Sequence, residues 1–209
     1  MKIKVCGMRE ADNIRAVDAL GVDYMGFIFY PRSSRYISEI PSFMPERAKR
    51  VGVFVDASTA DIIDRISSYG LDIVQLHGHE SPQQCQNLRQ KAELHLEIGI
   101  KIWKAISIDS SADLQECEKY LKCIDGFVFD TKCSSYGGSG NKYDWNVLSA
   151  YTCPLPFLLS GGIGPDDANK IQTFHHSQFM GIDLNSRFES APALKDIEKL
   201  DTFIKNIEH

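Results

Sequence analysis

Polar residues suited to proton transfer or ligand binding stand at the ends of four short apolar runs. Cys6 ends Lys2–Cys6, His77 ends Leu71–His77, Asp130 ends Ile124–Asp130, and Asp183 ends Phe179–Asp183. A thiol and a carboxyl group can serve as the base and the acid of a proton-transfer reaction. The carboxyl ends of the strands in a parallel α/β barrel meet at one mouth, so these four side chains are predicted to share a pocket there.

Cys6 is followed by Gly7 at the end of its run. One interpretation is a small buried apolar residue, which is the usual role of a lone cysteine. The other is a catalytic base or nucleophile. Lys4 lies on the same face of the predicted strand, and its charge is expected to lower the pKa of the thiol.

Asp130 is followed by the loop Thr131–Tyr143, which contains Gly137-Gly138-Ser139-Gly140. The carboxyl group either caps this loop or acts as a general acid. A mobile glycine-rich loop can cover a ligand. A carboxyl group beside Phe129 and under such a loop can have the raised pKa that a general acid requires.

Two later segments are typical of a phosphate site. Ser160-Gly161-Gly162-Ile163-Gly164-Pro165 joins the seventh run to a helix, and glycines allow backbone N–H groups to approach an anion. Gly181–Ser186 covers the eighth run and the start of its loop. The loops after strands seven and eight often bind phosphate in such barrels, although a pair of ordinary tight turns would have the same composition.

Further charged and imidazole groups lie near the predicted mouth. Arg35, in the loop after the second run, can bind a carboxylate through two parallel hydrogen bonds, or it belongs to a solvated basic loop. His77 and His79 could reach one metal ion, but no third ligand has a clear position in the sequence. We therefore expect no metal, with His77 as a hydrogen-bonding residue of the mouth and His79 and Glu80 in a polar loop.

Eight strand-like runs alternate with helical patterns, which favours a parallel sheet. The strands are predicted at Lys2–Cys6, Asp23–Phe29, Arg50–Val55, Asp72–His77, Lys101–Ile106, Ile124–Asp130, Leu155–Ser160 and Phe179–Leu184. The helices are predicted at Glu10–Leu20, Pro41–Lys49, Ser58–Ser68, from Ser81-Pro82 onward, and at Asp109–Leu121, Asp144–Tyr151, Pro165–Thr173 and Pro192–Ile207. Right-handed crossovers between parallel strands are compatible with a closed barrel or an open doubly wound sheet. Eight strand–helix units within 209 residues favour a single (β/α)8 TIM barrel domain over residues 1–209.

Side chains alternate along a strand, so each run divides into two faces. Ile3, Val5, Phe127, Phe129, Met180 and Ile182 form the apolar face that is predicted to pack on the helices. Lys4 with Cys6, Gln75 with His77, Val128 with Asp130, and Gly181 with Asp183 form the other face. We expect this second face to point into the barrel.

The composition is that of an ordinary globular protein, with 43% hydrophobic and 24% charged residues. A net charge of −5 argues against nucleic-acid and anionic-membrane partners. The sequence shows neither a signal peptide nor an apolar run near the ~18 residues of a membrane span. Its six cysteines form no CxxC pair, so a cytoplasmic protein with free thiols is expected.

Taken together, these motifs resemble the phosphoribosylanthranilate isomerases, (β/α)8 enzymes of tryptophan biosynthesis. The resemblance runs from Lys2 to about Glu189. Its carriers are Lys4-Val5-Cys6-Gly7-Met8-Arg9, Ser34-Arg35-Tyr36, Gln75-Leu76-His77-Gly78, Phe129-Asp130, Gly137-Gly138-Ser139-Gly140 with Asp144-Trp145, Leu159-Ser160-Gly161-Gly162-Ile163, and Gly181-Ile182-Asp183 with Ser186 and Glu189. Each motif is weak alone, but their order and spacing are specific.

The resemblance implies an Amadori rearrangement of N-(5-phosphoribosyl)anthranilate with Asp130 as general acid and Cys6 as general base. It implies that Arg35 binds the anthranilate carboxylate, and that Gly161, Gly162 and Ser186 bind the phosphate. His77 and Asp183 are expected to contact the sugar. The reaction needs no cofactor, and the implied partner is a small phosphorylated substrate of a monomer or homodimer.

One segment departs from the family pattern. The family usually shows Ser-Ser-Gly-Val-Glu after strand eight, where this chain has Asn185-Ser186-Arg187-Phe188-Glu189. An arginine in place of glycine removes backbone freedom and adds a cation near the expected phosphate. We expect Arg187 to leave phosphate binding intact.

Two other functions fit a phosphate-binding barrel. A sugar-phosphate epimerase commonly needs a metal or a pair of carboxylates, whereas this chain offers Cys6 with Asp130. A non-catalytic sugar-phosphate-binding or anthranilate-binding regulator would not require an acid–base pair. Turnover in the presence of a chelator separates the first from an isomerase, and ligand binding without turnover identifies the second.

Overall fold

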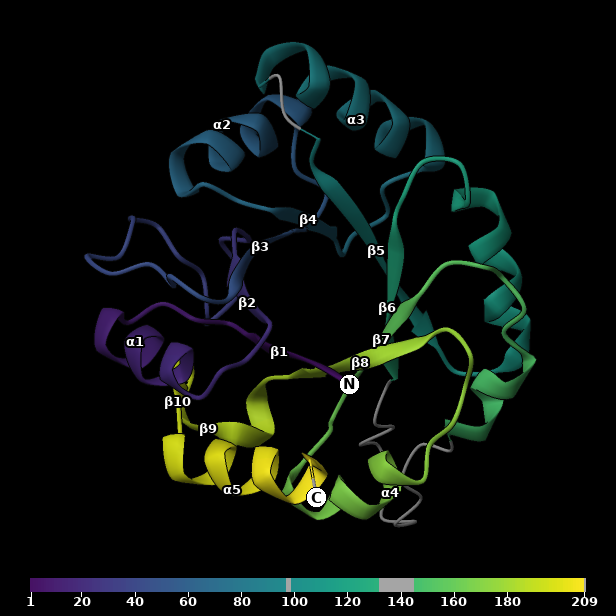
Figure 1. Ribbon diagram of the computed structural model, residues 1–209. Coiled ribbons are helices and arrows are strands. Elements are labelled where there is room, and N and C mark those ends of the chain that lie inside the picture. Colours follow the sequence, from purple (N-terminus) through teal and green to yellow (C-terminus); the bar gives the residue numbers. More distant parts are fainter. Residues whose placement is uncertain (97–98, 132–144, 209) are drawn as a thin grey trace.

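Eight parallel strands close into a barrel around the centre of the molecule, as predicted (Figure 1). The computed structural model describes residues 1–96, 99–131 and 145–208. The strands, in order around the barrel, are β1 (Lys2–Cys6), β2 (Tyr24–Ile28), β3 (Lys49–Phe54), β4 (Ile73–Leu76), β5 (Lys101–Ile108), β6 (Gly126–Thr131), β7 (Phe157–Ser160) and β8 (Phe179–Leu184). Pairing of β1 with β8 closes the ring.

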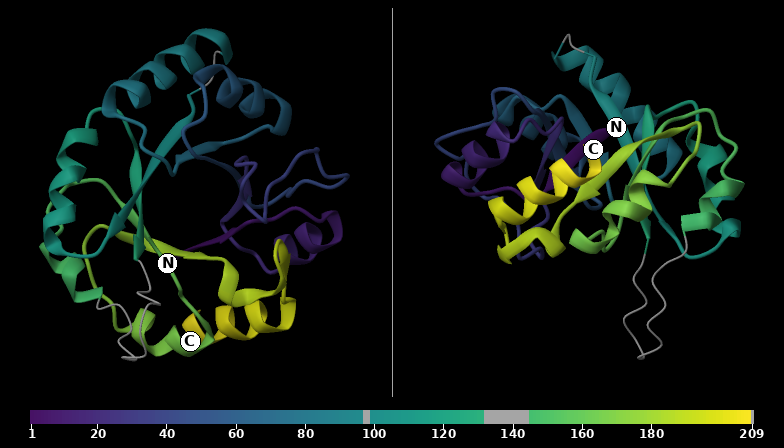
Figure 2. Two further views of the ribbon diagram at one scale, coloured as in Figure 1. Left: turned by 180° about the vertical axis from the view of Figure 1, so that it is seen from behind. Right: turned by 60° about the horizontal axis from the view of Figure 1, so that its bottom comes forward.

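The helices form an outer layer around the strands (Figures 1 and 2). They are α1 (Ala11–Ala19), α2 (Thr59–Tyr69), α3 (Pro82–Leu96), α4 (Ala168–Gln172) and α5 (Ile197–Glu208). The connections also contain the 3₁₀ segments η1 (Ser111–Tyr120), η2 (Trp145–Ala150), η3 (Pro165–Asp167) and η4 (Ser186–Phe188). No helix in the described part of the chain is both long and apolar enough to cross a membrane.

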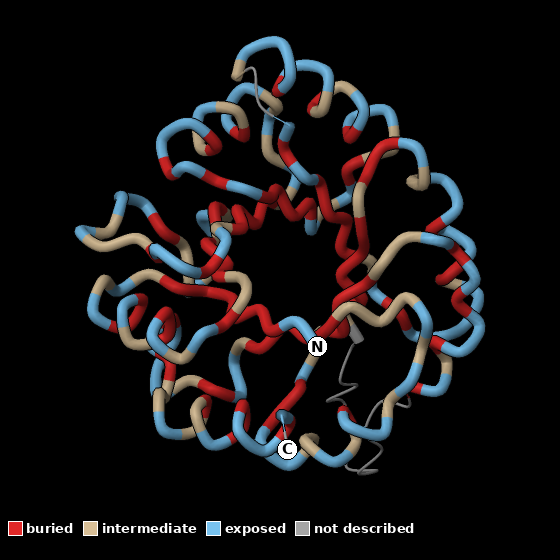
Figure 3. Tube along the Cα trace, in the orientation of Figure 1, coloured by how far each residue is buried: buried red, intermediate tan, exposed pale blue. Residues whose placement is uncertain are grey.

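The two faces of the strands mostly have the roles that the alternation predicts. Met180 is the exception, because a register shift between β7 and β8 turns it from the helix-facing side to the cluster inside the barrel. Ile3 and Val5 belong to the large apolar core between strands and helices. A smaller cluster fills the barrel itself and consists of Val51, Ile73, Trp103, Ala105, Val128 and Leu158. Figure 3 shows the strands as a buried ring inside the mostly exposed surface of the helices. The barrel is therefore a packed core whose carboxyl end can carry polar side chains.

Aspartates join neighbouring strands at the opposite, amino end of the barrel. Asp23, just before β2, accepts a hydrogen bond from the backbone N–H of Ile3 in β1 at 2.9 Å. Asp125, just before β6, accepts one from Ile102 in β5 at 2.7 Å. Asp72, just before β4, makes the equivalent bond to β3. These bonds satisfy the N–H groups at which the β1, β3 and β5 ladders begin.

The helix predicted at Pro41–Lys49 is wrong. Instead, the carboxylate of Asp18 in α1 accepts hydrogen bonds from the backbone N–H groups of Glu46, Arg47 and Ala48 at 2.9–3.4 Å. These N–H groups are therefore held by a residue from another element, and the segment stays irregular up to the start of β3. Pro45, which donates no backbone hydrogen bond, further disfavours a helix.

The last predicted helix, Pro192–Ile207, begins five residues too early. A small hairpin precedes it, formed by β9 (Glu189–Ala191) and β10 (Leu194–Lys195). Ala193 has a positive φ of 66°, which a helix does not allow. Asp196 then accepts a hydrogen bond from the N–H of Lys199 at 3.0 Å and caps α5.

Candidate active site

A cavity opens at the carboxyl ends of the strands. The lining residues include Cys6, His77, Asp130, Gly161, Gly162, Asp183 and Ser186. These are seven of the eight residues that the sequence places in a site. They come from strands β1, β4, β6, β7 and β8 and the loops that follow them, so the closed barrel brings together positions up to 180 residues apart in the chain. The eighth residue, Arg35, is not in this lining.

Cys6 is buried at the end of β1, opposite Gly26 of β2. A Cβ atom at Gly26 would lie 2.6 Å from the Cys6 sulfur, so glycine leaves the space that the thiol occupies. Burial raises the pKa of the Cys6 thiol, while the positive charges of Lys4 and Lys195 act to lower it. Lys4 therefore acts on the thiol in the predicted direction, but desolvation outweighs its charge and the net pKa of Cys6 is raised.

Lys4 and Asp183 form an ion pair inside the barrel, two residues before the strand end that carries Cys6. Lys4 Nζ lies 2.7 Å from Asp183 Oδ2, and the two side chains are 0% and 5% exposed. Burial opposes the charge on Lys4, but Asp183 and Cys6 together leave the pKa of Lys4 raised. The second oxygen of Asp183 is buried and has no hydrogen-bond partner in the described part of the chain. The Asp183 side chain also lines the cavity.

Asp130 at the end of β6 faces His77, which follows β4. Their Oδ2 and Nε2 atoms are 3.5 Å apart, and both side chains are about one-third exposed. The amide nitrogen of Gln75 lies 3.2 Å from the other ring nitrogen of His77. With Gln75 donating to Nδ1, the neutral imidazole carries its proton on Nε2, toward Asp130. His77 and Asp130 therefore face each other in the cavity.

The loop after β7 supplies a cradle of backbone groups. Gly161 and Gly162 have positive φ angles of 90° and 66°, which favour glycine. Ser186 and Arg187, directly after β8, line the same cavity as these glycines. Backbone N–H groups, a hydroxyl and a guanidinium thus lie where a small anion would bind.

Arg35 packs beside the cavity. A Cβ atom at Gly7 would lie 2.7 Å from Arg35 Cδ, which places the arginine directly over the residue after Cys6. Its Nε and Nη2 atoms donate to the carboxylate of Glu189 at 2.6–3.0 Å. Glu189 also pairs with the buried Lys195 at 2.5 Å. Lys195 is not among the predicted site residues, because the sequence pattern predicts a helix over its segment where the structure has a hairpin.

His77 and His79 have different surroundings. The side chain of His79 is 96% exposed and pairs with Asp56, whereas His77 lines the cavity. Glu80 is buried and pairs with Lys104 at 3.2 Å. The side chains of His77, His79 and Glu80 therefore have three different surroundings and do not point at one common position.

Some of the predicted features lie outside the described residues. These are Cys133, the Gly137–Gly140 segment of the loop expected to cover the ligand, and Asp144. Trp145, which follows them, is buried at the start of η2.

Comparison with known proteins gives one consistent result. The family model described as N-(5'phosphoribosyl)anthranilate (PRA) isomerase matches residues 3–206. A relative from Phocaeicola vulgatus, named N-(5'-phosphoribosyl)anthranilate isomerase, is 48% identical over 208 residues, covering 100% of this chain and 98% of its own. The crystal structure of phosphoribosyl anthranilate isomerase from Thermotoga maritima aligns with a TM-score of 0.79 and 30% identity, over 100% of this chain and 98% of that one.

A further crystal structure is that of a phosphoribosyl anthranilate isomerase in complex with reduced 1-(o-carboxyphenylamino)-1-deoxyribulose 5-phosphate. It aligns with a TM-score of 0.78 and 26% identity, covering 100% of this chain and 98% of that one. Barrel, motifs and sequence identity over nearly the whole length agree. The chain belongs to the N-(5'-phosphoribosyl)anthranilate isomerase family.

Proposed function

We propose that this protein converts N-(5-phosphoribosyl)anthranilate to 1-(2-carboxyphenylamino)-1-deoxyribulose 5-phosphate, an aldose–ketose isomerisation of tryptophan biosynthesis. The observation that carries the proposal is that Cys6 and Asp130 line one cavity together with Gly161, Gly162 and Ser186. An acid, a base and an anion cradle in one cavity are what an Amadori rearrangement of a sugar phosphate requires.

The acid acts first. Asp130 donates its proton to the furanose ring oxygen, the C1–O bond breaks, and the nitrogen lone pair forms the C1=N bond of a Schiff base. His77, 3.5 Å from Asp130, holds the carboxyl group toward the sugar. General acid catalysis of this kind typically contributes about 10²–10⁴ in rate.

The base acts second. The thiolate of Cys6 removes the proton from C2, and the electrons of that C–H bond form C1=C2 while the C=N electrons return to nitrogen. The resulting enolamine tautomerises to the ketone. Protons are moved within one molecule, so the overall reaction is redox-neutral and needs no external oxidant or reductant.

The two anionic ends of the substrate fit one anion-binding group that lines the cavity and one that lies beside it. Gly161, Gly162 and Ser186 bind the phosphate. Arg35 binds the anthranilate carboxylate. Glu189 accepts hydrogen bonds from its Nε and Nη2 atoms, so the Nη1 atom is the donor that Arg35 offers to this carboxylate. The unpaired oxygen of Asp183 accepts a sugar hydroxyl.

The proposal extends to the setting of the enzyme. It is a cytoplasmic protein whose residues 1–209 act as one barrel domain, as a monomer or homodimer, on a small phosphorylated substrate, without nucleic-acid or membrane partners. The net charge of −5 and the spacing of the cysteines support this setting.

Turnover of freshly generated phosphoribosylanthranilate in the presence of a chelator tests the proposal. Cys6→Ala and Asp130→Asn should each reduce kcat by at least ~100-fold. Cys117→Ala, at a buried cysteine outside the cavity lining, and Asp64→Asn, at an exposed carboxylate on α2, serve as matched controls and should retain activity. A folded wild-type protein that binds substrate without turning it over would contradict the proposal and favour a non-catalytic sugar-phosphate-binding barrel.

A further inference from the structure

Arg187 stands where the family pattern that this chain resembles has a glycine. The backbone does not require glycine there, because within the described residues Asp56 and Ala193 are the non-glycine positions with positive φ. Arg187 instead lies in η4, a short 3₁₀ turn that begins at Ser186. The substitution is accommodated by ordinary backbone geometry, and what it changes is the side chain.

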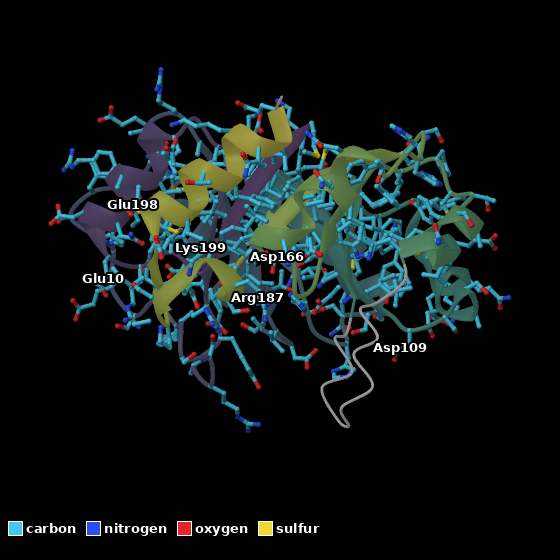
Figure 4. The ribbon with its side chains drawn as sticks, turned by 90° about the horizontal axis from the view of Figure 1, so that it is seen from below. Glu10, Asp109, Asp166, Arg187, Glu198 and Lys199 are labelled. Atoms are coloured by element: carbon cyan, nitrogen blue, oxygen red, sulfur yellow. The ribbon has the colours of Figure 1, made fainter. Side chains whose placement is uncertain are left out.

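The Arg187 side chain extends across the loop that follows β7. A Cβ atom at Gly164 would lie 3.2 Å from Arg187 Nε and 3.7 Å from Nη2, so the guanidinium rests directly on that glycine. Arg187 also lines the cavity together with Gly161, Gly162 and Ser186. Figure 4 shows Arg187 near the segment that carries Asp166, two residues beyond Gly164.

The charge of Arg187 is not neutralised by a carboxylate of the described chain. Lys4 pairs with Asp183, while Arg35 and Lys195 both pair with Glu189. Arg187 forms no such pair with a described residue. It is also the one lysine or arginine among the described residues that line the cavity. The N–H of Gly164 itself is donated to Asp167 Oδ2 at 2.8 Å. An exposed guanidinium that lines the cavity with Gly161 and Gly162 is well suited to bind a phosphate through two hydrogen bonds.

We propose that Arg187 is a side-chain ligand of the substrate phosphate, in addition to the backbone cradle of the loop that carries Gly161 and Gly162. The inference rests on the proposed function, since it assumes a phosphorylated substrate. The phosphate lies at the end of the substrate away from C1 and C2. Its contact with Arg187 therefore contributes equally in ground state and transition state, which changes KM and leaves kcat unchanged.

Steady-state kinetics of Arg187→Gln, Arg187→Lys and Arg187→Gly test this role. The control is Arg47→Gln, because Arg47 is exposed at the opposite end of the barrel, just before β3. Arg187→Gln and Arg187→Gly should raise KM about 10-fold, with kcat within about twofold of wild type, because a charge-assisted hydrogen bond at an exposed site is lost. Arg187→Lys should retain part of the affinity, and Arg47→Gln should behave like wild type.

Inorganic phosphate provides a second probe that does not depend on turnover. Phosphate binding is measured by calorimetry in low salt, and Arg187→Gln should bind phosphate about 10-fold more weakly than wild type. Phosphate binding by wild type should also weaken as the salt concentration is raised. Unchanged KM and unchanged phosphate affinity in Arg187→Gln would overturn the inference, as would tighter binding by Arg187→Gly. If wild type lacks turnover, the proposed function fails, and the phosphate titration alone decides the role of Arg187.

Discussion

Lys4 Nζ lies 2.7 Å from Asp183 Oδ2 in the interior of the barrel, on the strand face that also carries Cys6. Burying two charges costs desolvation energy that their attraction repays only in part, so a pair of this kind adds little net stability. Its main effect is to hold a positive charge close to a buried thiol. Lys4 thereby limits how far burial raises the pKa of Cys6.

Removing Lys4 should make Cys6 a poorer acid. The thiolate is the charged form, so loss of the cation destabilises it and raises the pKa of Cys6 further. Because Lys4→Met alone would leave Asp183 buried without its partner, the comparison is Lys4→Met/Asp183→Asn against Asp183→Asn. The pH at which iodoacetamide alkylation of Cys6 reaches half its maximal rate should be higher in the double variant than in Asp183→Asn.

The Cys6→Ala variant gives the background alkylation of the other cysteines for this measurement. Equal alkylation profiles for the double and the single variant would show that Lys4 has no electrostatic effect on Cys6. In active variants, the acid-side limb of the kcat/KM profile should move in the same direction as the alkylation profile.

The sequence predicts which residues line the site better than it predicts their pKa values. Strand-end position and alternation place Cys6, His77, Asp130 and Asp183 at one cavity, because parallel strands bring their carboxyl ends together. Lys4 acts to lower the pKa of Cys6, as predicted, but the net pKa is raised, since the desolvation of the thiol depends on the packing of the whole barrel. A local pattern such as Lys4-Val5-Cys6 shows the neighbouring charge but not the burial.

His77 should act through Asp130 and not independently. His77→Asn removes the imidazole that faces Asp130 at 3.5 Å and should lower kcat by about 10–100-fold, less than Asp130→Asn does. The double variant His77→Asn/Asp130→Asn should be no slower than Asp130→Asn alone, because residues that act as a unit are non-additive. Multiplicative losses measured in this double-mutant cycle would instead assign His77 a separate contact with substrate.

Glu189 should control both the position of Arg35 and the stability of the fold in acid. Burial acts to raise the pKa of Glu189, but hydrogen bonds from Arg35 and Lys195 leave it lowered. A lowered folded-state pKa contributes stability that is present above the unfolded value of about 4.3 and is lost as pH falls through the folded value. The free energy of unfolding should therefore decrease below about pH 4.3, less steeply in Glu189→Gln than in wild type.

Urea unfolding between pH 3 and 6 measures this slope, with Glu198→Gln on the exposed face of α5 as control. At neutral pH, Glu189→Gln should also raise KM, because Arg35 loses the charged partner that orients it beside Gly7. Identical pH slopes for wild type and Glu189→Gln would show that this carboxylate makes no net contribution to acid stability.

Sequence patterns failed where the chain is held by contacts distant in sequence. The strands β1 and β8 have their predicted bounds, because runs rich in apolar residues are a local signal. The segment before β3 is short and contains Pro45, and its backbone N–H groups bind to Asp18, about thirty residues earlier. The Glu189–Lys195 hairpin is likewise set by the contacts of Lys195 with Glu189 and Asn185. Neither arrangement has a periodicity to detect.

Asp18→Ala should therefore destabilise the barrel without affecting its chemistry. The substitution leaves the N–H groups of Glu46, Arg47 and Ala48 without their acceptor, and each unpaired donor that stays buried costs roughly 1–3 kcal/mol. Because two of the three bonds are only partly buried, the expected loss is about 2 kcal/mol in the free energy of unfolding. Asp18→Asn retains one oxygen acceptor, so its free energy of unfolding should lie between those of wild type and Asp18→Ala.

Asp12→Ala is the matched control, since Asp12 is an exposed aspartate of the same helix and should change stability by less than ~1 kcal/mol. Equilibrium urea unfolding of the three variants and wild type measures these differences, and kcat at a temperature where all are folded should be unchanged. An Asp18→Ala variant as stable as Asp12→Ala would mean that water replaces the carboxylate at these N–H groups. The segment before β3 would then be held by its apolar contacts and not by Asp18.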